Sequence, residues 1–183
     1  MRLIVAITGA SGVIYGKRLI EVLKEKGVEV HLILSKSAKI VVEHELGDLN
    51  AFEKKADFVY DSEDIKAPPT SGSFKVDGMI VIPATMKTVA AIASGYADNL
   101  IARAADVQIK ERRPLILVPR ETPLNAIHLD NMASLSRLGV VILPAMPAFY
   151  HRPSTIGDLV DFIVGKVLDQ LGLEHDLYSP WKG

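Results

Sequence analysis

The feature that most constrains the fold is a regular alternation between short apolar runs and longer segments with helical spacing. The apolar runs are rich in valine and isoleucine, contain no polar alternation, and cover residues 3–7, 28–34, 79–82, 115–118 and 140–143, with a weaker candidate at 58–60. Uninterrupted runs of this length are typical of strands that helices cover on both faces. Helical spacing fills the intervals, over 13–26, 37–45, 85–94, 100–112, 124–138 and 156–171.

This order of elements predicts an α/β protein. Strands that alternate with helices form right-handed βαβ units, so we expect a doubly wound, Rossmann-like or flavodoxin-like three-layer sandwich with a mostly parallel sheet. The length of 183 residues and the 49% hydrophobic content suit one domain, which we expect to span residues 1–183. Ligands of such sheets bind beyond the carboxyl ends of the strands, so the segments that follow the strands are the place to seek a site.

Charge and composition narrow the classes of ligand. A formal net charge of -1 provides no basic field for nucleic acid. The absence of cysteine removes disulfides and thiolate chemistry and fits a cytoplasmic protein. The first apolar run is too short for a membrane span, and His128 and His151 lack the spacing of a metal site. We therefore expect a small-molecule ligand, with no nucleic acid, membrane or metal involved.

A glycine turn, Thr-Gly-Ala-Ser-Gly at residues 8–12, follows the first apolar run directly. Gly9 and Gly12 permit close backbone approach, and Ser11 adds a hydroxyl beside the free N–H groups of the next helix, so the turn predicts a phosphate site. The spacing fits neither the Walker pattern nor the full dinucleotide fingerprint, and no acid for a ribose follows the second run. A mononucleotide is favoured over NAD, while a dinucleotide with a phosphate ester bound by Ser35 and Lys36 stays open.

Polar residues also follow two later apolar runs. Thr85 and Thr88 stand at a helix start, where they are typical caps and can also bind a ligand. Arg120 and Glu121 stand at the end of a strand and favour a functional role. Glu45, near the end of the second helix, is by default an exposed residue.

Two other groups have competing interpretations. Arg103, Asp106 and Lys110 share one stripe of a helix, which is also typical of a solvated ion-pair face. The segment Phe-Tyr-His-Arg-Pro at 149–153 suits a substrate-binding loop or a simple loop closure. The polar tail at 174–183 contains Trp181, which we expect to dock against another part of the protein.

Several blocks in this order resemble the UbiX family of flavin prenyltransferases, and the resemblance covers nearly the whole chain. The blocks are VAITGASG at 5–12, ILSK at 33–36, RAADV at 103–107, KERRP at 110–114, VPRETP at 118–123 and PAFYHRP at 147–153. The resemblance implies transfer of a dimethylallyl group from dimethylallyl monophosphate to N5 and C6 of reduced FMN, without a metal. It also implies that the prenyl-FMN serves a UbiD-type decarboxylase and that the enzyme is a homo-oligomer, commonly a dodecamer, with its site at subunit contacts.

The resemblance assigns site residues. Those that correspond to FMN-contacting positions are Gly9, Ala10, Ser11, Ser35, Thr85, Met86, Lys87, Thr88 and Arg120, with Arg103 in the same neighbourhood. Those that correspond to positions at the prenyl phosphate are Tyr150 and Lys166, and further active-site positions are Glu45, Lys110, Glu121 and Trp181. Two departures stand out: Ala84-Thr85 replaces a more frequent Cys-Ser pair, and Lys166 replaces a common arginine, which exchanges a bidentate fork for a point charge.

These positions lead to hypotheses about their roles. Ser11, hydrogen-bonded to Glu45, is expected to relay the N5 proton, and Glu121 or the released phosphate to serve the later proton transfer. The cationic groups Lys110, Arg120 and Lys166, together with the Tyr150 hydroxyl, are expected to stabilise the leaving phosphate, and the face of Trp181 the allylic cation.

Three alternatives remain in view. An FMN carrier would need only the cradle residues, whereas the additional charged groups favour catalysis. A flavin-dependent decarboxylase of the phosphopantothenoylcysteine type would need a histidine near the start of the second helix, where residues 35–40 contain none. Direct decarboxylation of aromatic acids would need an acid-binding group separate from the phosphate site, and none is evident.

Overall fold

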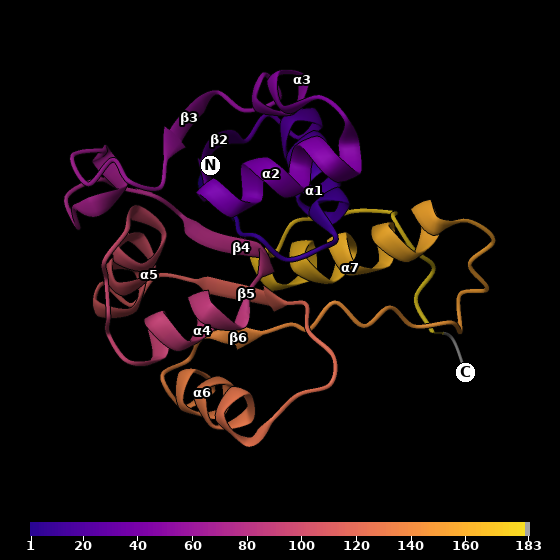
Figure 1. Ribbon diagram of the computed structural model, residues 1–183. Helices are drawn as coiled ribbons and strands as arrows, with labels where there is room; N and C mark the ends of the chain where they lie inside the picture. The colour runs from indigo at the N-terminus through magenta and orange to yellow at the C-terminus, as the bar shows by residue number, and fades with distance from the viewer. Residues whose placement is uncertain (182–183) are drawn as a thin grey trace.

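The computed structural model describes residues 1–181 and contains one parallel sheet between two layers of helices (Figure 1). Residues 182 and 183 of the expected domain and tail lie outside the described residues. All strand pairs are parallel, in the order β3-β2-β1-β4-β5-β6. The strands are β1 (Arg2–Ile7), β2 (Glu29–Leu34), β3 (Phe58–Asp61), β4 (Gly78–Ala84), β5 (Leu115–Pro119) and β6 (Val141–Ile142). The predicted doubly wound α/β fold is confirmed.

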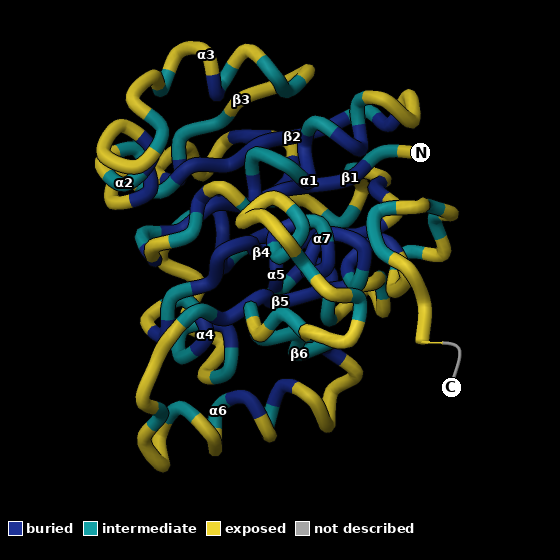
Figure 2. Tube along the Cα trace, turned by 90° about the vertical axis from the view of Figure 1, so that its right-hand side faces the viewer, coloured by how far each residue is buried: buried dark blue, intermediate teal, exposed yellow. Residues whose placement is uncertain are grey.

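Each face of the sheet is covered by three longer helices. One layer consists of α1 (Val13–Glu25), α2 (Lys36–Leu46) and α7 (Ile156–Leu171), and the other of α4 (Met86–Ala93), α5 (Leu100–Lys110) and α6 (Ala126–Arg137). Successive β1 side chains alternate between the two cores: Leu3 and Val5 pack toward the α1 layer, and Ile4 toward the α5 layer. Burial on both faces explains the uninterrupted apolar runs, and Figure 2 shows the buried strands between helices with exposed outer sides.

The structure differs from the predicted elements in small, explicable ways. The weak run at 58–60 forms β3, an edge strand whose exposed Phe58 and Val59 account for its weak pattern. Helix α5 ends at Lys110 rather than 112, because Arg112 has a φ of 54° and Pro114 disfavours a helical residue before it. Two short pieces, α3 (Leu49–Glu53) and the 3₁₀ helix η1 (Pro68–Thr70), are too short to show a period in the sequence.

The strand order places a topological switch point between β1 and β4. The chain moves outward from β1 through β2 to β3 and then crosses to β4 on the other side of β1. This is the Rossmann order, and without β3 the remaining five strands have the flavodoxin order. Both orders place the ligand in the crevice beyond the carboxyl ends of the two strands at the switch. Within residues 1–181, no helix is long and apolar enough to cross a membrane.

Candidate functional site

A cleft of about 280 Å³ opens at the carboxyl ends of β1, β2 and β4, at the switch point. Helices α2 and α4 both begin at this cleft, where their N-terminal dipoles favour an anion. The polar lining is rich in hydroxyls and includes two lysines: Thr8, Ser35, Ser37, Ser62, Thr85, Thr88, Lys36, Lys87, Glu63 and Asn99. The hydroxyls and lysines of this lining are donors that suit a phosphate group, while the Glu63 carboxylate pairs with Lys36.

Thr8 holds the two strand ends together. Its hydroxyl donates to the Pro83 carbonyl at 2.7 Å and accepts from the Thr85 N–H at 2.8 Å. The residue is 2% exposed. Next to it, a β-carbon on Gly9 would collide with the Ser37 side chain. The glycine is therefore required because the turn after β1 and the start of α2 are in direct contact.

Glu45 occupies the N-terminus of α1. Its carboxylate accepts from the N–H groups of Gly12 at 2.9 Å and Val13 at 3.2 Å. Burial raises the pKa of Glu45, but hydrogen bonds from the Ser11 side chain and from these two N–H groups, with the charge of Arg120, lower it below its usual value. An ionised carboxylate already satisfies this helix terminus, which corrects the expectation from the turn alone that a phosphate binds at α1.

Arg120 is a half-buried cation close to Glu45. Its backbone N–H donates to the Ala84 carbonyl at 3.2 Å, which fixes it between the ends of β4 and β5. Its charge lowers the pKa of Glu45 and opposes the rise that burial causes in the pKa of Tyr15. Among the described residues the buried Nε of Arg120 has no hydrogen-bond partner. Buried donors are nearly always paired, so an acceptor from a ligand is indicated here.

A second, more apolar hollow of about 200 Å³ lies beside Arg120, between the end of β5 and the segment after β6. Met132, Met146 and Leu124 supply apolar surface, and Glu121 stands at its edge. Glu121 is exposed, and its carboxylate accepts from the N–H of Thr122 at 3.0 Å. The hollow is suited to a small apolar group.

Three predicted residues form a separate group around α7 and the C-terminal tail. Tyr150 is 41% exposed and meets Trp181 edge to face, with ring centroids 5.8 Å apart. Lys166 donates to Asp169 at 2.8 Å and to the Tyr178 hydroxyl at 3.4 Å. The hydrogen bond to Asp169 raises the pKa of Lys166. Trp181 thus contacts Tyr150, but it remains 70% exposed in the single chain.

Three other predicted residues do not reach the cleft through their side chains in a single chain. Met86, the first residue of α4, is buried in the core between that helix and the sheet. Arg103 pairs with Asp106 at 2.9 Å, and Lys110 pairs with Glu111 at 3.4 Å. Helix α5 begins at the cleft and ends at Lys110, roughly 15 Å away at 1.5 Å per residue. One chain alone therefore leaves Lys110 far from the cleft.

Sequence reasoning missed several cleft residues. Ser37, Ser62, Glu63 and Asn99 all line it. Asn99 caps α5 by accepting from the Ala102 N–H at 3.0 Å, a signal present in the sequence as a typical cap. Ser62 and Glu63 lie after an irregular edge strand and carry no such signal. Within residues 1–181, no group of three or more metal-ligating side chains is close enough to hold an ion.

The Rossmann strand order and a hydroxyl-lined cleft at its switch point define a doubly wound α/β protein built to hold an anionic, nucleotide-like ligand. Comparison with known proteins agrees, since the family described as Flavoprotein matches residues 1–168. The chain is 52% identical to flavin prenyltransferase UbiX of Methanothermobacter thermautotrophicus over 182 residues, which cover 99% of this chain and 95% of that protein. It therefore belongs to the UbiX family of flavin prenyltransferases, as its motifs predicted.

Solved structures support the same assignment. A dodecameric FMN-dependent UbiX-like decarboxylase from Escherichia coli O157:H7 superimposes with a TM-score of 0.97 at 51% identity, covering 100% of both chains. AnUbiX, solved in complex with FMN and dimethylallyl pyrophosphate, gives a TM-score of 0.97 at 46% identity, covering 100% of this chain and 97% of that chain. The fold of this chain is thus the fold of those flavoproteins over its whole length.

Proposed function

We propose that this protein is a flavin prenyltransferase that moves a dimethylallyl group from dimethylallyl monophosphate to N5 and C6 of reduced FMN. The observation that carries the proposal is the group formed by Ser11, the Glu45 carboxylate at the start of α1 and the Arg120 Nε, which has no hydrogen-bond partner within residues 1–181. A carrier would need only the phosphate cradle. A hydroxyl linked to a carboxylate and balanced by a nearby cation is an arrangement for moving a proton.

The residues present fit FMN. The starts of α2 and α4 offer hydroxyls and Lys87 to its phosphate, at Ser35, Ser37, Thr85 and Thr88. Arg120 offers its unpaired Nε to an acceptor of the ring system. Reduced FMN supplies the nucleophilic nitrogen and carbon of the reaction when bound.

The chain's own groups account for the charges and protons of the transfer. Ser11 takes the proton that N5 loses and passes it to Glu45, which its lowered pKa keeps ionised and therefore without a proton of its own. Tyr150, Lys166 and Lys110 bind the phosphate as it takes the electron pair of the breaking carbon–oxygen bond. The face of Trp181 stabilises the positive charge on the allyl group. Glu121, beside the apolar hollow, serves the later proton loss from C6.

The proposal includes a homo-oligomer, expected to be a dodecamer, with Arg103 and Lys110 completing the site of a neighbouring copy. Large apolar side chains stand exposed on α6 and in the segment after β6, and these are Ile127, Leu129, Met146 and Phe149. Such surface is typical of subunit contacts. Sedimentation as a monomer with full activity would contradict this part. We also propose a cytoplasmic protein that passes its product to a UbiD-type decarboxylase.

The proposal is tested by the chemical identity of the flavin that the protein produces. The protein is incubated without oxygen with reduced FMN and dimethylallyl monophosphate, and in a parallel sample with the pyrophosphate. The extracted flavin is then examined by mass and absorption. A mass gain of one dimethylallyl unit supports the transferase. Bound but unmodified FMN with both donors would indicate a carrier, and carbon dioxide released from a cysteine-terminated peptide or an aromatic acid would indicate a decarboxylase.

A further inference from the structure

The C-terminal tail, residues 172–181, folds back along α7 and meets it at one carboxylate. Asp169 accepts from Lys166 Nζ at 2.8 Å and from the Tyr178 hydroxyl at 2.7 Å, and it shares a hydrogen bond with His175 Nε2 at 3.0 Å. Two of these partners come from the tail and one from α7. We call these four residues the Asp169 latch.

Gly165 makes room for the latch on the helix. A β-carbon at this position would lie 2.7 Å from the Tyr178 ring and 2.8 Å from the His175 ring, closer than real contacts allow. On the same helix, a β-carbon at Gly157 would meet only the Thr155 hydroxyl at 3.4 Å, an ordinary contact. The tail therefore lies directly against the α7 backbone at Gly165, whereas no atom of the described tail lies within 4 Å of a β-carbon at Gly157.

Aromatic contacts connect the latch to the predicted prenyl-phosphate residues. The ring centroids of Tyr178 and Phe162 lie 5.0 Å apart, and those of Phe162 and Tyr150 lie 5.9 Å apart. The Tyr150 ring in turn contacts the Trp181 ring, with centroids 5.8 Å apart. Tyr178 holds the tail on α7, and Trp181, three residues further along the tail, contacts Tyr150. The position of Tyr178 thus limits where Trp181 can lie.

We propose that Asp169 and Gly165 are positioning residues for the prenyl donor: they hold the tail so that Trp181 faces Tyr150, and they aim the Lys166 ammonium. The inference rests on the proposed function, which gives Tyr150, Lys166 and Trp181 their roles. Lysine is a flexible point charge where an arginine would supply a rigid fork. Here Asp169 and the Tyr178 oxygen engage two of its three N–H donors and leave the third for a phosphate.

The experiment compares Gly165→Ala with Gly157→Ala in the full-length assembled protein. Trp181 is the single tryptophan of the chain, so the anisotropy of tryptophan emission reports on the tail alone. We expect Gly165→Ala to lower this anisotropy and to raise KM for dimethylallyl monophosphate about tenfold, which corresponds to the loss of one well-placed interaction. The affinity for FMN is expected to stay within about twofold, because the cleft is untouched, and kcat is expected to fall, because Trp181 and Lys166 stabilise the charges that develop as the carbon–oxygen bond breaks. Gly157→Ala should match the parent in all four measurements.

Equal anisotropy and KM in the two alanine variants would overturn the proposal, as would lowered anisotropy with unchanged KM. Should Gly165→Ala fail to fold, Tyr178→Phe decides, because it removes one hydrogen bond to Asp169 and keeps the ring against Phe162. It is expected to raise KM by a smaller factor, and an unchanged KM would overturn the proposal. If the parent protein makes no prenyl-flavin, the proposed function fails, and with it the positioning role, while the anisotropy still shows whether the latch holds the tail.

Discussion

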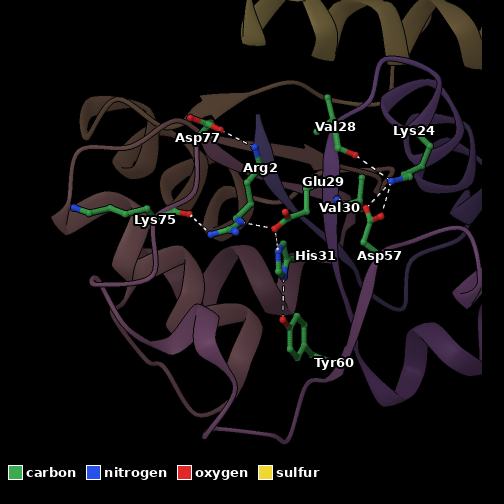
Figure 3. Close-up of polar contacts among 10 residues, drawn as sticks. All are labelled: Arg2, Lys24, Val28, Glu29, Val30, His31, Asp57, Tyr60, Lys75 and Asp77. Carbon is green, nitrogen blue, oxygen red and sulfur yellow. Dashed lines mark hydrogen bonds and ion pairs between the residues drawn. The ribbon is translucent and has the colours of Figure 1, made fainter.

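The two edges of the sheet handle their polar groups in opposite ways. At the amino-terminal edge, Arg2 pairs with Glu29, Glu29 meets His31 Nε2 at 2.7 Å, and His31 Nδ1 meets the Tyr60 hydroxyl at 2.9 Å (Figure 3). His31 is 3% exposed, and both of its ring nitrogens are paired. At the carboxyl-terminal edge, the buried Nε of Arg120 has no partner within the described chain, and hydroxyls line an open cleft.

This difference separates structural polar groups from those reserved for a ligand. Both edges bury or partly bury charged groups, so burial alone does not mark a site. A closed network satisfies its own donors and acceptors and stabilises the fold, whereas an open one carries an unmet requirement that a ligand can fill. A buried histidine is often taken for a functional residue, yet here the unpaired arginine is the better indicator.

The strongest test of this comparison makes the same substitution at both edges. Glu45→Gln should keep FMN bound but lower kcat by a factor on the order of 10² to 10⁴, because the amide cannot accept a proton from Ser11. Glu29→Gln, in the closed network, should leave kcat unchanged and lower only stability. The rate of prenyl-FMN formation by purified, FMN-loaded protein measures both. The relay is discarded if Glu45→Gln works at the parent rate.

The second test removes the unpaired cation. Arg120→Met should weaken FMN binding about 10- to 100-fold, since a hydrogen bond to a charged group contributes about 1.5–3 kcal/mol. It should not destabilise the FMN-free protein, because the removed Nε has no partner there. Fluorescence titration with FMN measures the affinity, and thermal unfolding of the FMN-free protein measures the stability. If this variant binds FMN as tightly as the parent, then Arg120 at the carboxyl-terminal edge of the sheet does not bind FMN.

Most of the fold could be predicted because it depends on local periodicity. The strands β1, β4 and β5 appear as apolar runs, β2 appears as an apolar run interrupted by His31, and the alternation of these strands with helices determines the topology. The five-residue helix α3 could not be found, because it is shorter than the window in which a helical period is visible.

The sequence offered candidate site residues, but it did not show where the fold places them. Glu45 lies 32 residues from Val13, whose N–H it accepts, and no local pattern shows that this carboxylate occupies the α1 terminus assigned to a phosphate. Lys110 matches a site motif, yet the length of α5 carries it away from its own cleft. Such long-range pairings depend on the packed sheet, and local sequence rules do not contain them.

The third test disrupts the closed network at the amino-terminal edge of the sheet and leaves the carboxyl-terminal edge unchanged. Tyr60→Phe removes the hydroxyl that pairs with His31 Nδ1 and leaves a buried nitrogen unsatisfied. The free energy of unfolding should fall by about 1–3 kcal/mol. Urea unfolding measures the loss, and the affinity for FMN and the kcat of the folded fraction should stay at parent values. A changed kcat with unchanged stability would contradict the assignment of this edge to structure.

The smallest effect concerns pH at the same closed edge. Burial raises the pKa of Asp57, but its hydrogen bonds from Lys24 at 2.6 Å and from the Val30 N–H at 2.8 Å outweigh this and lower the pKa below its usual value. A lowered folded-state pKa contributes stability that is present above the unfolded-state value of about 3.9 and is lost as the pH falls through the folded-state value. The difference in unfolding free energy between the parent and Asp57→Asn should therefore be constant from about pH 7 to 5 and shrink below about pH 4. A difference that grew on acidification would show that the Asp57 carboxylate is not stabilised by its pairing with Lys24.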